Sequence, residues 1–120
     1  MASDAVLTLD GHPELRVTRL TAADVGRLQE LYEACADFTI LVEGEPPGPH
    51  AAAEDLASLP PGSRPEDKHV FGLVDAQGRI VAMLEAIRGS PEPRTWWIAL
   101  MMVAPRRRRD GVGAALHAAL

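Results

Sequence analysis

Four consecutive arginines, Arg106 to Arg109, are followed directly by Asp110, Gly111 and, after one more residue, Gly113. Clustered guanidinium groups bind phosphate oxygens through paired hydrogen bonds. Glycines let an anion approach the backbone closely, because they carry no side chain. If a helix begins here, its first amides and its dipole also favour a bound anion. This segment is therefore predicted to bind a phosphorylated ligand.

The neighbouring residues place this segment between a strand and a helix. Every residue from Trp96 to Val103 is apolar, which is typical of a central strand buried on both faces. Pro105 has no amide hydrogen, so the strand should end there. Beyond it, apolar residues recur every four positions and predict a helix that begins near Asp110 or Gly111. This apolar stripe consists of Val112, Leu116 and Leu120.

Two common phosphate-binding motifs do not fit these residues. A P-loop requires a lysine followed by Ser or Thr, and the segment contains no lysine. The dinucleotide motif GxGxxG fails because Leu116 occupies the position of its third small residue. The pattern that fits is Arg-x-x-Gly-x-Gly, from Arg108 to Gly113, preceded by an apolar strand and by Ala104-Pro105. It resembles motif A of the GNAT acyltransferases, which that family uses to hold the pyrophosphate of acetyl-coenzyme A.

The resemblance implies a set of binding residues. Backbone amides near Met102 and Val103, where the strand is expected to bulge beside the thioester, would stabilise the oxyanion. Many members carry glycine where Arg109 stands, and Asp110 is expected to cap the helix with its carboxylate turned away from the phosphates. The alternative interpretations of the arginine run are a solvated turn and a nucleic-acid patch. The residues that would hold the pyrophosphate are Arg108, Arg109, Asp110, Gly111, Val112 and Gly113.

Composition limits the classes of function. The chain has 120 residues and a net charge of −5, and four of its twelve lysines and arginines are consecutive. Nucleic acid is therefore not expected as a partner, since it normally requires a basic face. Cys35 is the only cysteine, so a reducing, cytoplasmic location is expected, and no metal signature is present. No apolar segment is long enough to span a membrane, and none resembles a signal peptide.

The first part of the chain is expected to form a strand and a helix. Residues 1–13 suggest a loose leader, in which Ala5 to Leu9 could add an edge strand. Alternation from Leu15 to Leu20 predicts a half-buried strand. Thr21 then offers an N-cap, with Asp24 in the capping-box position. The predicted apolar helix face, in which Tyr32 is interpreted as a core aromatic and Cys35 as a core thiol, contains Val25, Leu28, Leu31, Tyr32 and Cys35.

The middle of the chain is rich in proline. Residues 37–42 could extend the first helix or begin a second one, residues 43–50 must form a loop, and residues 51–59 predict a short helix. Residues 60–68 form another connection. In the GNAT fold, segments between the first two strands line the acyl-acceptor site, so the resemblance assigns substrate choice to these loops.

Two apolar runs, His69 to Val74 and Arg79 to Arg88, flank turn residues and predict an antiparallel hairpin. Residues 89–93 should turn the chain into the following strand. Alternation places Ile80 with Ala82, Leu84 and Ala86 on one face, and Glu85 with Val81, Met83 and Ile87 on the other. Burial among these apolar neighbours would raise the pKa of Glu85 and could make it a general base for an ammonium substrate. The alternative is a solvated carboxylate near a frayed strand end.

Taken with the resemblance, these observations predict one α/β (α+β) domain over residues 1–120, with a mixed, mostly antiparallel sheet flanked by helices. The family continues after motif A with a further strand and helix, which often supply a tyrosine that protonates the departing thiolate. We therefore expect a domain truncated after the motif A helix. The implied function is acetyl transfer from acetyl-coenzyme A to a primary amine of a small molecule or peptide, by direct attack. The alternative is a non-catalytic module that binds coenzyme A or a protein. A homodimer could cover the exposed sheet edge.

Overall fold

A computed structural model describes residues 7–9, 11–59, 64–89, 96–108 and 111–119. Its sheet contains five strands in the order β1-β2-β3-β4-β5, and each pair of neighbours is antiparallel. The order in space follows the order in the chain, as in a meander. The strands are β1 Leu7–Leu9, β2 His12–Arg19, β3 Lys68–Val74, β4 Ile80–Arg88 and β5 Trp96–Val103.

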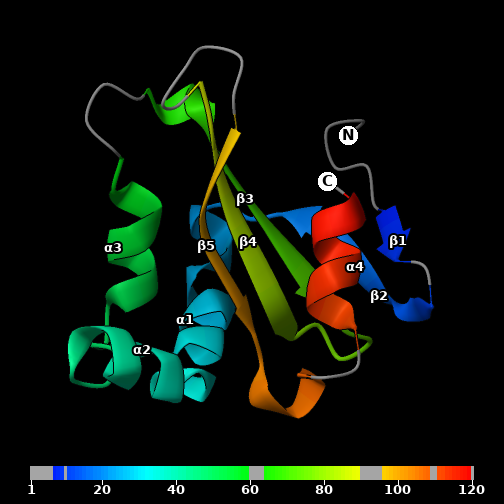
Figure 1. Cartoon of the computed structure of the whole chain (residues 1–120), viewed down its shortest axis with the longest axis horizontal. Helices are drawn as coiled ribbons and strands as arrows, with labels where there is room; N and C mark the ends of the chain where they lie inside the picture. The colour runs from blue at the N-terminus through cyan, green and yellow to red at the C-terminus, as the bar shows by residue number, and fades with distance from the viewer. Residues whose placement is uncertain (1–6, 10, 60–63, 90–95, 109–110, 120) are drawn as a thin grey trace.

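Helices cover both faces of this sheet. Three of them, α1 Val25–Ala34, α2 Ala36–Glu43 and α3 Ala51–Ala57, lie on one side, and α4 Val112–Ala119 lies on the other (Figure 1). Short 3-10 turns precede α1, β3 and α4. These turns are η2 Ala22–Asp24, η3 Pro65–Asp67 and η4 Pro105–Arg107. The predicted α+β class with an antiparallel sheet is confirmed.

Each side of the sheet has its own core. On the side of α1 and α3, Leu28, Leu31 and Tyr32 pack against Val70 and Met83. On the side of α4, Val112 and Leu116 pack against strand residues that include Leu15 and Leu84. The described residues of the predicted α4 stripe and most of the predicted α1 face thus contact the sheet. Among the described residues, no helix has the length and apolar character needed to cross a membrane.

The start of the chain contains the edge strand that was the alternative to a loose leader. Residues 7–9 form β1, and β2 begins at His12 rather than at Leu15. Residues 1–6 lie outside the described part. The predicted capping box is present, because the Thr21 hydroxyl accepts from the Ala23 amide at 3.3 Å and the Asp24 carboxylate accepts from the Thr21 amide at 2.9 Å. This box caps η2, which leads directly into α1.

Residues 37–42 belong to a second helix, α2, and do not extend α1. The break falls at Cys35, whose φ of −95° and ψ of 28° interrupt the helical path. The Cys35 side chain is fully buried, as predicted for a core thiol. Helix α3 is two residues shorter than expected. The predicted connection at residues 60–68 is described only in part, since residues 60–63 lie outside the described residues.

The β3–β4 hairpin is confirmed, and its turn is held by the buried Asp75. The Asp75 carboxylate accepts hydrogen bonds from the amides of Gln77 and Arg79, both at 2.9 Å. The alternation expected along β4 is wrong at its first residues. Val74 pairs with Ile80 and Leu73 with Ala82, so Val81 is an extra residue that moves Ile80 to the opposite core. This bulge could not be predicted from alternation, because it adds one residue to one strand only.

Strand β5 is not central in the described sheet. It pairs with β4 on one side and has no partner strand among the described residues on its other side. Trp96 is 54% exposed and Ile98 40% exposed, so the prediction of burial on both faces is wrong for the first half of this strand. Residues 90–95, which contain most of the predicted turn at 89–93, lie outside the described part.

Candidate functional site

At the end of β5, one residue directs its backbone N–H and C=O away from β4. Ala104 donates its amide to the Val81 carbonyl at 2.8 Å, so Ala104 faces β4. In an antiparallel pair, successive residues alternate between facing the partner strand and facing away from it. Val103 therefore directs its N–H and C=O to the unpaired edge, whereas Met102, which pairs with Met83, belongs to the β4 ladder. Of the two predicted oxyanion donors, only Val103 lies on the open edge.

The predicted bulge of β5 exists at a different place. Glu85 pairs with Leu100 and Ala86 with Ile98, so Ala99 is the extra residue. Met102 and Val103 pair in regular register with Met83 and Ala82. The expectation of a bulge at Met102 and Val103 is therefore wrong, because the insertion lies earlier in the strand. An uninterrupted run of apolar residues carries no signal for the position of such an insertion.

Arg108 binds both the end of this strand edge and helix α2. Its Nε donates to the Val103 carbonyl at 2.9 Å, and its guanidinium binds both carboxylate oxygens of Asp37 in α2, at 2.6 and 3.2 Å. The Cys35 thiol donates to the same carbonyl at 3.4 Å. The side chain that was expected to contribute charge to the pyrophosphate site is thus committed to Asp37 and Val103. Sequence could not reveal this partner, which lies 71 residues away.

The ionisation of these groups follows from their contacts. Hydrogen bonding to Arg108 lowers the pKa of Asp37, and the same bond raises the pKa of Arg108. Burial raises the pKa of Cys35, and the influence of Arg108 opposes this only in part. The thiol therefore stays neutral, and Cys35 fits a core role rather than that of a nucleophile.

The two glycines of the motif have different roles. Gly111 has a φ of +82°, which a residue with a side chain rarely adopts, and a Cβ built on it would meet no described atom within 4 Å. Gly113 lies against the sheet, where a Cβ would come 3.1 Å from Met101 Cε and 3.3 Å from Val103 Cγ2. Gly113 therefore permits close packing of α4 on β5, and a methyl group there would point to the sheet rather than to a ligand.

The remaining predicted binding residues lie around the start of α4. The helix begins at Val112, one or two residues later than expected, and the Gly111 carbonyl accepts its first hydrogen bond, from Ala115 at 3.0 Å. The Val112 side chain is fully buried, so only its backbone could contact a ligand. Arg109 and Asp110, including the predicted helix cap, lie outside the described residues, as does Leu120.

The arginine run also has partners within the fold. Arg106 lies 3.8 Å from the Asp75 carboxylate, which is also 3.5 Å from Arg79. Burial pushes the pKa of Asp75 upward, but hydrogen bonds from the amides of Arg79 and Gln77, together with the two arginines, leave it below its usual range. The run therefore links η4 to the β3–β4 turn as well as to α2.

Glu85 is neither solvated nor unpaired. The Lys68 ammonium lies 2.7 Å from Glu85 Oε1, and the two side chains are only 6% and 12% exposed. Lys68 also donates to the carbonyls of Asp55 and, at 2.6 Å, of Ser58. The expectation of a solvated carboxylate near a frayed strand end is wrong. The ion pair instead connects β3, β4 and the end of α3.

A cavity of about 520 Å³ lies on the α1 side of β5. Its walls come from α1, α2, the loop to α3, α3 itself and the bulged part of β5. In it, the Tyr32 hydroxyl donates to Asp55 Oδ2 at 2.7 Å. Sequence reasoning placed Tyr32 in the core correctly but did not identify Asp55, because only the fold brings α3 beside α1. The lining residues include Tyr32, Glu43, Glu45, Glu54, Asp55 and Ala99.

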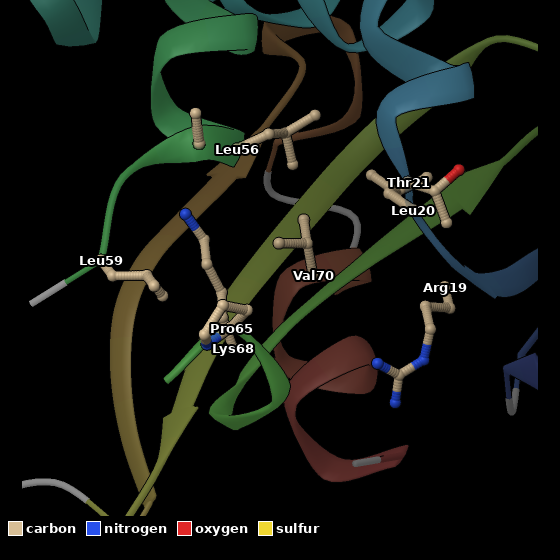
Figure 2. A pocket seen from close by; sticks show the side chains of 9 residues that line it. Arg19, Leu20, Thr21, Leu56, Leu59, Pro65, Lys68 and Val70 are labelled. Carbon is tan, nitrogen blue, oxygen red and sulfur yellow. The ribbon is translucent and has the colours of Figure 1, made fainter. Parts of the chain in front are cut away.

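A second hollow, of about 330 Å³, lies at the other end of the same sheet face, between α3 and the start of β3 (Figure 2). Its walls are mostly apolar, including Leu20, Leu56 and Val70. Figure 2 shows Lys68 extending toward the end of α3. The Lys68 ammonium has three donors, and Glu85, Asp55 and Ser58 accept from them. This hollow therefore offers no unsatisfied ammonium to an anion.

The end of β5 thus brings together an outward-facing amide, a left-handed glycine and the start of the helix that follows. Residues 27–120 match the sequence model of the Acetyltransferase (GNAT) family. The chain therefore belongs to the GNAT family. No curated protein matches it. Within the described residues, no group of three or more His, Cys, Asp or Glu could hold a metal ion.

Solved structures show the same fold. An acetyltransferase from Thermus thermophilus is 22% identical with a TM-score of 0.74, over 88% of this chain and 66% of its own. The GNAT domain of S. lividans PAT is 20% identical with a TM-score of 0.67, and the match covers 98% of this chain and 69% of that one. AAC(6')-Iy, in complex with the bisubstrate analog CoA-S-monomethyl-acetylneamine, is 18% identical with a TM-score of 0.56, over 88% and 67%. The chain thus spans about two thirds of these proteins.

Proposed function

We propose that this protein transfers an acetyl group from acetyl-coenzyme A to a primary amine by direct attack. The observation that carries the proposal is the outward-facing amide of Val103, which lies at the end of β5 just before the turn that leads into α4. An amide at an unpaired strand edge can donate a hydrogen bond to an extended ligand. The first amides of the adjacent helix can bind the phosphates of the same ligand.

The described residues fit such a ligand. Space around Gly111 leaves its backbone accessible, and its left-handed conformation begins the turn into α4. We propose that amides from Arg108 to Gly113 hold the pyrophosphate, while the Arg108 side chain positions the turn by binding Asp37. A related fold, AAC(6')-Iy, is known in complex with a coenzyme A-containing bisubstrate analog, which supports coenzyme A as the co-substrate.

The chemistry is a single displacement. The lone pair of the amine attacks the thioester carbonyl, a C–N bond forms and the C–S bond breaks. The amine loses one proton and the thiolate gains one, so the products are an N-acetylamine and coenzyme A. We propose that the Val103 amide, rather than that of Met102, donates to the developing oxyanion. Glu85 stays a predicted base, although its ion pair with Lys68 favours a structural role.

A second candidate is a module that binds coenzyme A without catalysing transfer. The observation that favours it is the commitment of Glu85 to Lys68, since this leaves the predicted general base with an ammonium partner. Such a module would bind coenzyme A and release no thiol from acetyl-coenzyme A in the presence of amines.

Calorimetric titration tests the cofactor, and a thiol-release assay tests the transfer. Coenzyme A should bind, whereas pantetheine, which lacks the pyrophosphate, should bind at least about tenfold more weakly, or 1.4 kcal/mol. No heat of binding at millimolar coenzyme A would exclude both candidates. If coenzyme A binds but no primary amine in a panel causes thiol release, the non-catalytic module would be the remaining candidate.

A further inference from the structure

The cavity beside β5 has the dimensions of a small-molecule site. Its volume is about 520 Å³, within the range of roughly 300 to 1,000 Å³ that small ligands occupy. Tyr32, Leu100 and Met102 supply apolar surface from α1 and β5. The cavity also reaches the extra residue of the bulge, Ala99, so it opens on the strand that the proposed function assigns to the thioester.

Asp55 provides a fixed carboxylate in this cavity. Its Oδ2 accepts from the Tyr32 hydroxyl at 2.7 Å, and its backbone carbonyl accepts from the buried Lys68 ammonium. Both the side chain and the backbone of Asp55 are therefore held in place. Burial, reinforced by Asp55, raises the pKa of Tyr32, so its hydroxyl remains a donor to the carboxylate. Among the described residues, no hydrogen bond to Asp55 Oδ1 is present, which leaves this oxygen for a ligand.

The described charged side chains that line the cavity are all acidic, and the nearby Lys68 ammonium is paired with Glu85. Three more carboxylates, those of Glu43, Glu45 and Glu54, line the cavity and are exposed to solvent, and none of the described residues that line it is basic. Carboxylates that face one enclosed space attract cations and repel anions, because the low-dielectric walls concentrate their field. A neutral ligand would gain only hydrogen bonds from these carboxylates, whereas a ligand with two positive charges would also be attracted by its charge at both the wall and the rim.

We propose that this cavity binds the acceptor, and that the acceptor is a small aliphatic amine with at least two ammonium groups. One ammonium binds Asp55 Oδ1 on the cavity wall, and another lies among the glutamates at the rim. The proposal rests on the acetyl transfer proposed above and names its substrate class. Asp55 is assigned as a substrate-binding residue, and Tyr32 as the residue that positions its carboxylate.

Calorimetric titration of the full chain with 1,4-diaminobutane and with 1-aminobutane tests the cavity without requiring activity. The diamine should bind about tenfold more tightly than the monoamine, because one additional charge-assisted contact contributes roughly 1.5 kcal/mol. Asp55→Asn retains an acceptor for Tyr32 and should weaken diamine binding about tenfold. The matched control is Glu14→Gln, which removes the same charge from the exposed face of β2 and should leave binding unchanged.

A rim variant keeps the test valid if Asp55→Asn does not fold. Glu43→Gln with Glu54→Gln changes only exposed side chains and should weaken the diamine about threefold while leaving the monoamine unaffected. Equal affinity for the two amines, or equal losses in the cavity and control variants, would overturn the proposal. Coenzyme A titrated into the same sample separates the two proposals. Coenzyme binding without diamine preference overturns only the acceptor assignment, whereas diamine binding without coenzyme binding overturns the acetyl transfer and leaves a diamine site without an acceptor role.

Discussion

Arg108 joins three segments that are distant in sequence. Its guanidinium binds Asp37 at the start of α2, and its Nε binds the Val103 carbonyl at the end of β5, where the buried Cys35 thiol also donates. A bidentate arginine–carboxylate contact fixes direction as well as distance. Arg108 therefore sets the position of the turn that leads into α4.

The Arg108–Asp37 pair predicts a pH-dependent effect on stability. Because the hydrogen bond from Arg108 lowers the pKa of Asp37 in the folded state, the unfolded chain binds more protons between the two pKa values. The contribution of the pair is therefore present above the ordinary aspartate pKa and is lost as the pH falls through the lowered one. Asp37→Asn should unfold at lower urea than the native chain at about pH 7, and the difference should shrink at about pH 3.

Glu14→Gln, which alters an exposed carboxylate on β2, serves as the control and should match the native chain at both pH values. A difference for Asp37→Asn that is unchanged at low pH would show that the pair is not its origin.

Lys68 and Glu85 provide a second test at the scale of single residues. Both side chains are buried, so removal of one partner leaves an uncompensated charge. Glu85→Leu should lower the free energy of unfolding by about 3 kcal/mol, and the double variant Lys68→Met with Glu85→Leu should recover much of this loss. Urea denaturation measures both. If Glu85→Leu removed thiol release while stability stayed unchanged, Glu85 would be a catalytic base and not a structural residue.

At the scale of elements, the turn before α4 combines two different demands for glycine. Gly111 needs a left-handed backbone, whereas Gly113 must leave room for Met101 and Val103 across the helix–strand contact. The sequence motif alone suggested one reason for both, close approach of a ligand. An alanine at Gly113 would therefore have to displace the side chains of Met101 and Val103 in β5.

Gly111 and Gly26 form a matched pair for testing this assignment. Gly26 lies in the first turn of α1 without a positive φ, and a Cβ there would meet no described atom within 4 Å. Gly26→Ala should stabilise the protein by about 0.5–1 kcal/mol through helix propensity and a less flexible unfolded chain. Gly111→Ala should destabilise it by about 1 kcal/mol, because alanine disfavours the left-handed region. Thermal unfolding that shifts in the same direction for both variants would contradict the described start of α4.

At the scale of the whole molecule, the chain has a net charge of −5 and one short basic segment, Arg106 to Arg109. Some of the charges of this segment are neutralised by carboxylates within the fold. Arg106 lies near Asp75, and Arg108 binds Asp37. Nucleic-acid affinity depends on the number of phosphates that basic residues can neutralise. The structure thus supplies a reason, beyond composition, to expect no nucleic-acid function.

This expectation can be measured by fluorescence anisotropy with single-stranded DNA. At about 50 mM salt, the chain should show no saturable binding, and adding salt should not change the signal, because few phosphates can be contacted at once. Saturable binding that weakens steeply with salt, and that Arg107→Ala reduces, would restore the basic patch as the functional surface.

Much of the fold follows from local rules that the sequence contains. The β3–β4 hairpin, the capping box at Thr21, the core face of α1 and the strand–turn–helix order around the glycine motif were all predicted correctly. These features depend on contacts between residues close in the chain, or on periodic patterns that state which face is buried. The motif also identified the family, since its residue types and spacing are local.

Tertiary structure decided how the groups of the candidate site are paired. Arg108 with Asp37, Lys68 with Glu85 and Tyr32 with Asp55 are contacts between distant segments, and none has a signal in spacing or composition. The bulges at Val81 and Ala99 likewise arise from the pairing of two strands, so neither strand alone specifies them. Residue types state which chemistry is possible, but the fold determines which charges neutralise one another and which peptide group faces outward, because both depend on distances that only packing sets.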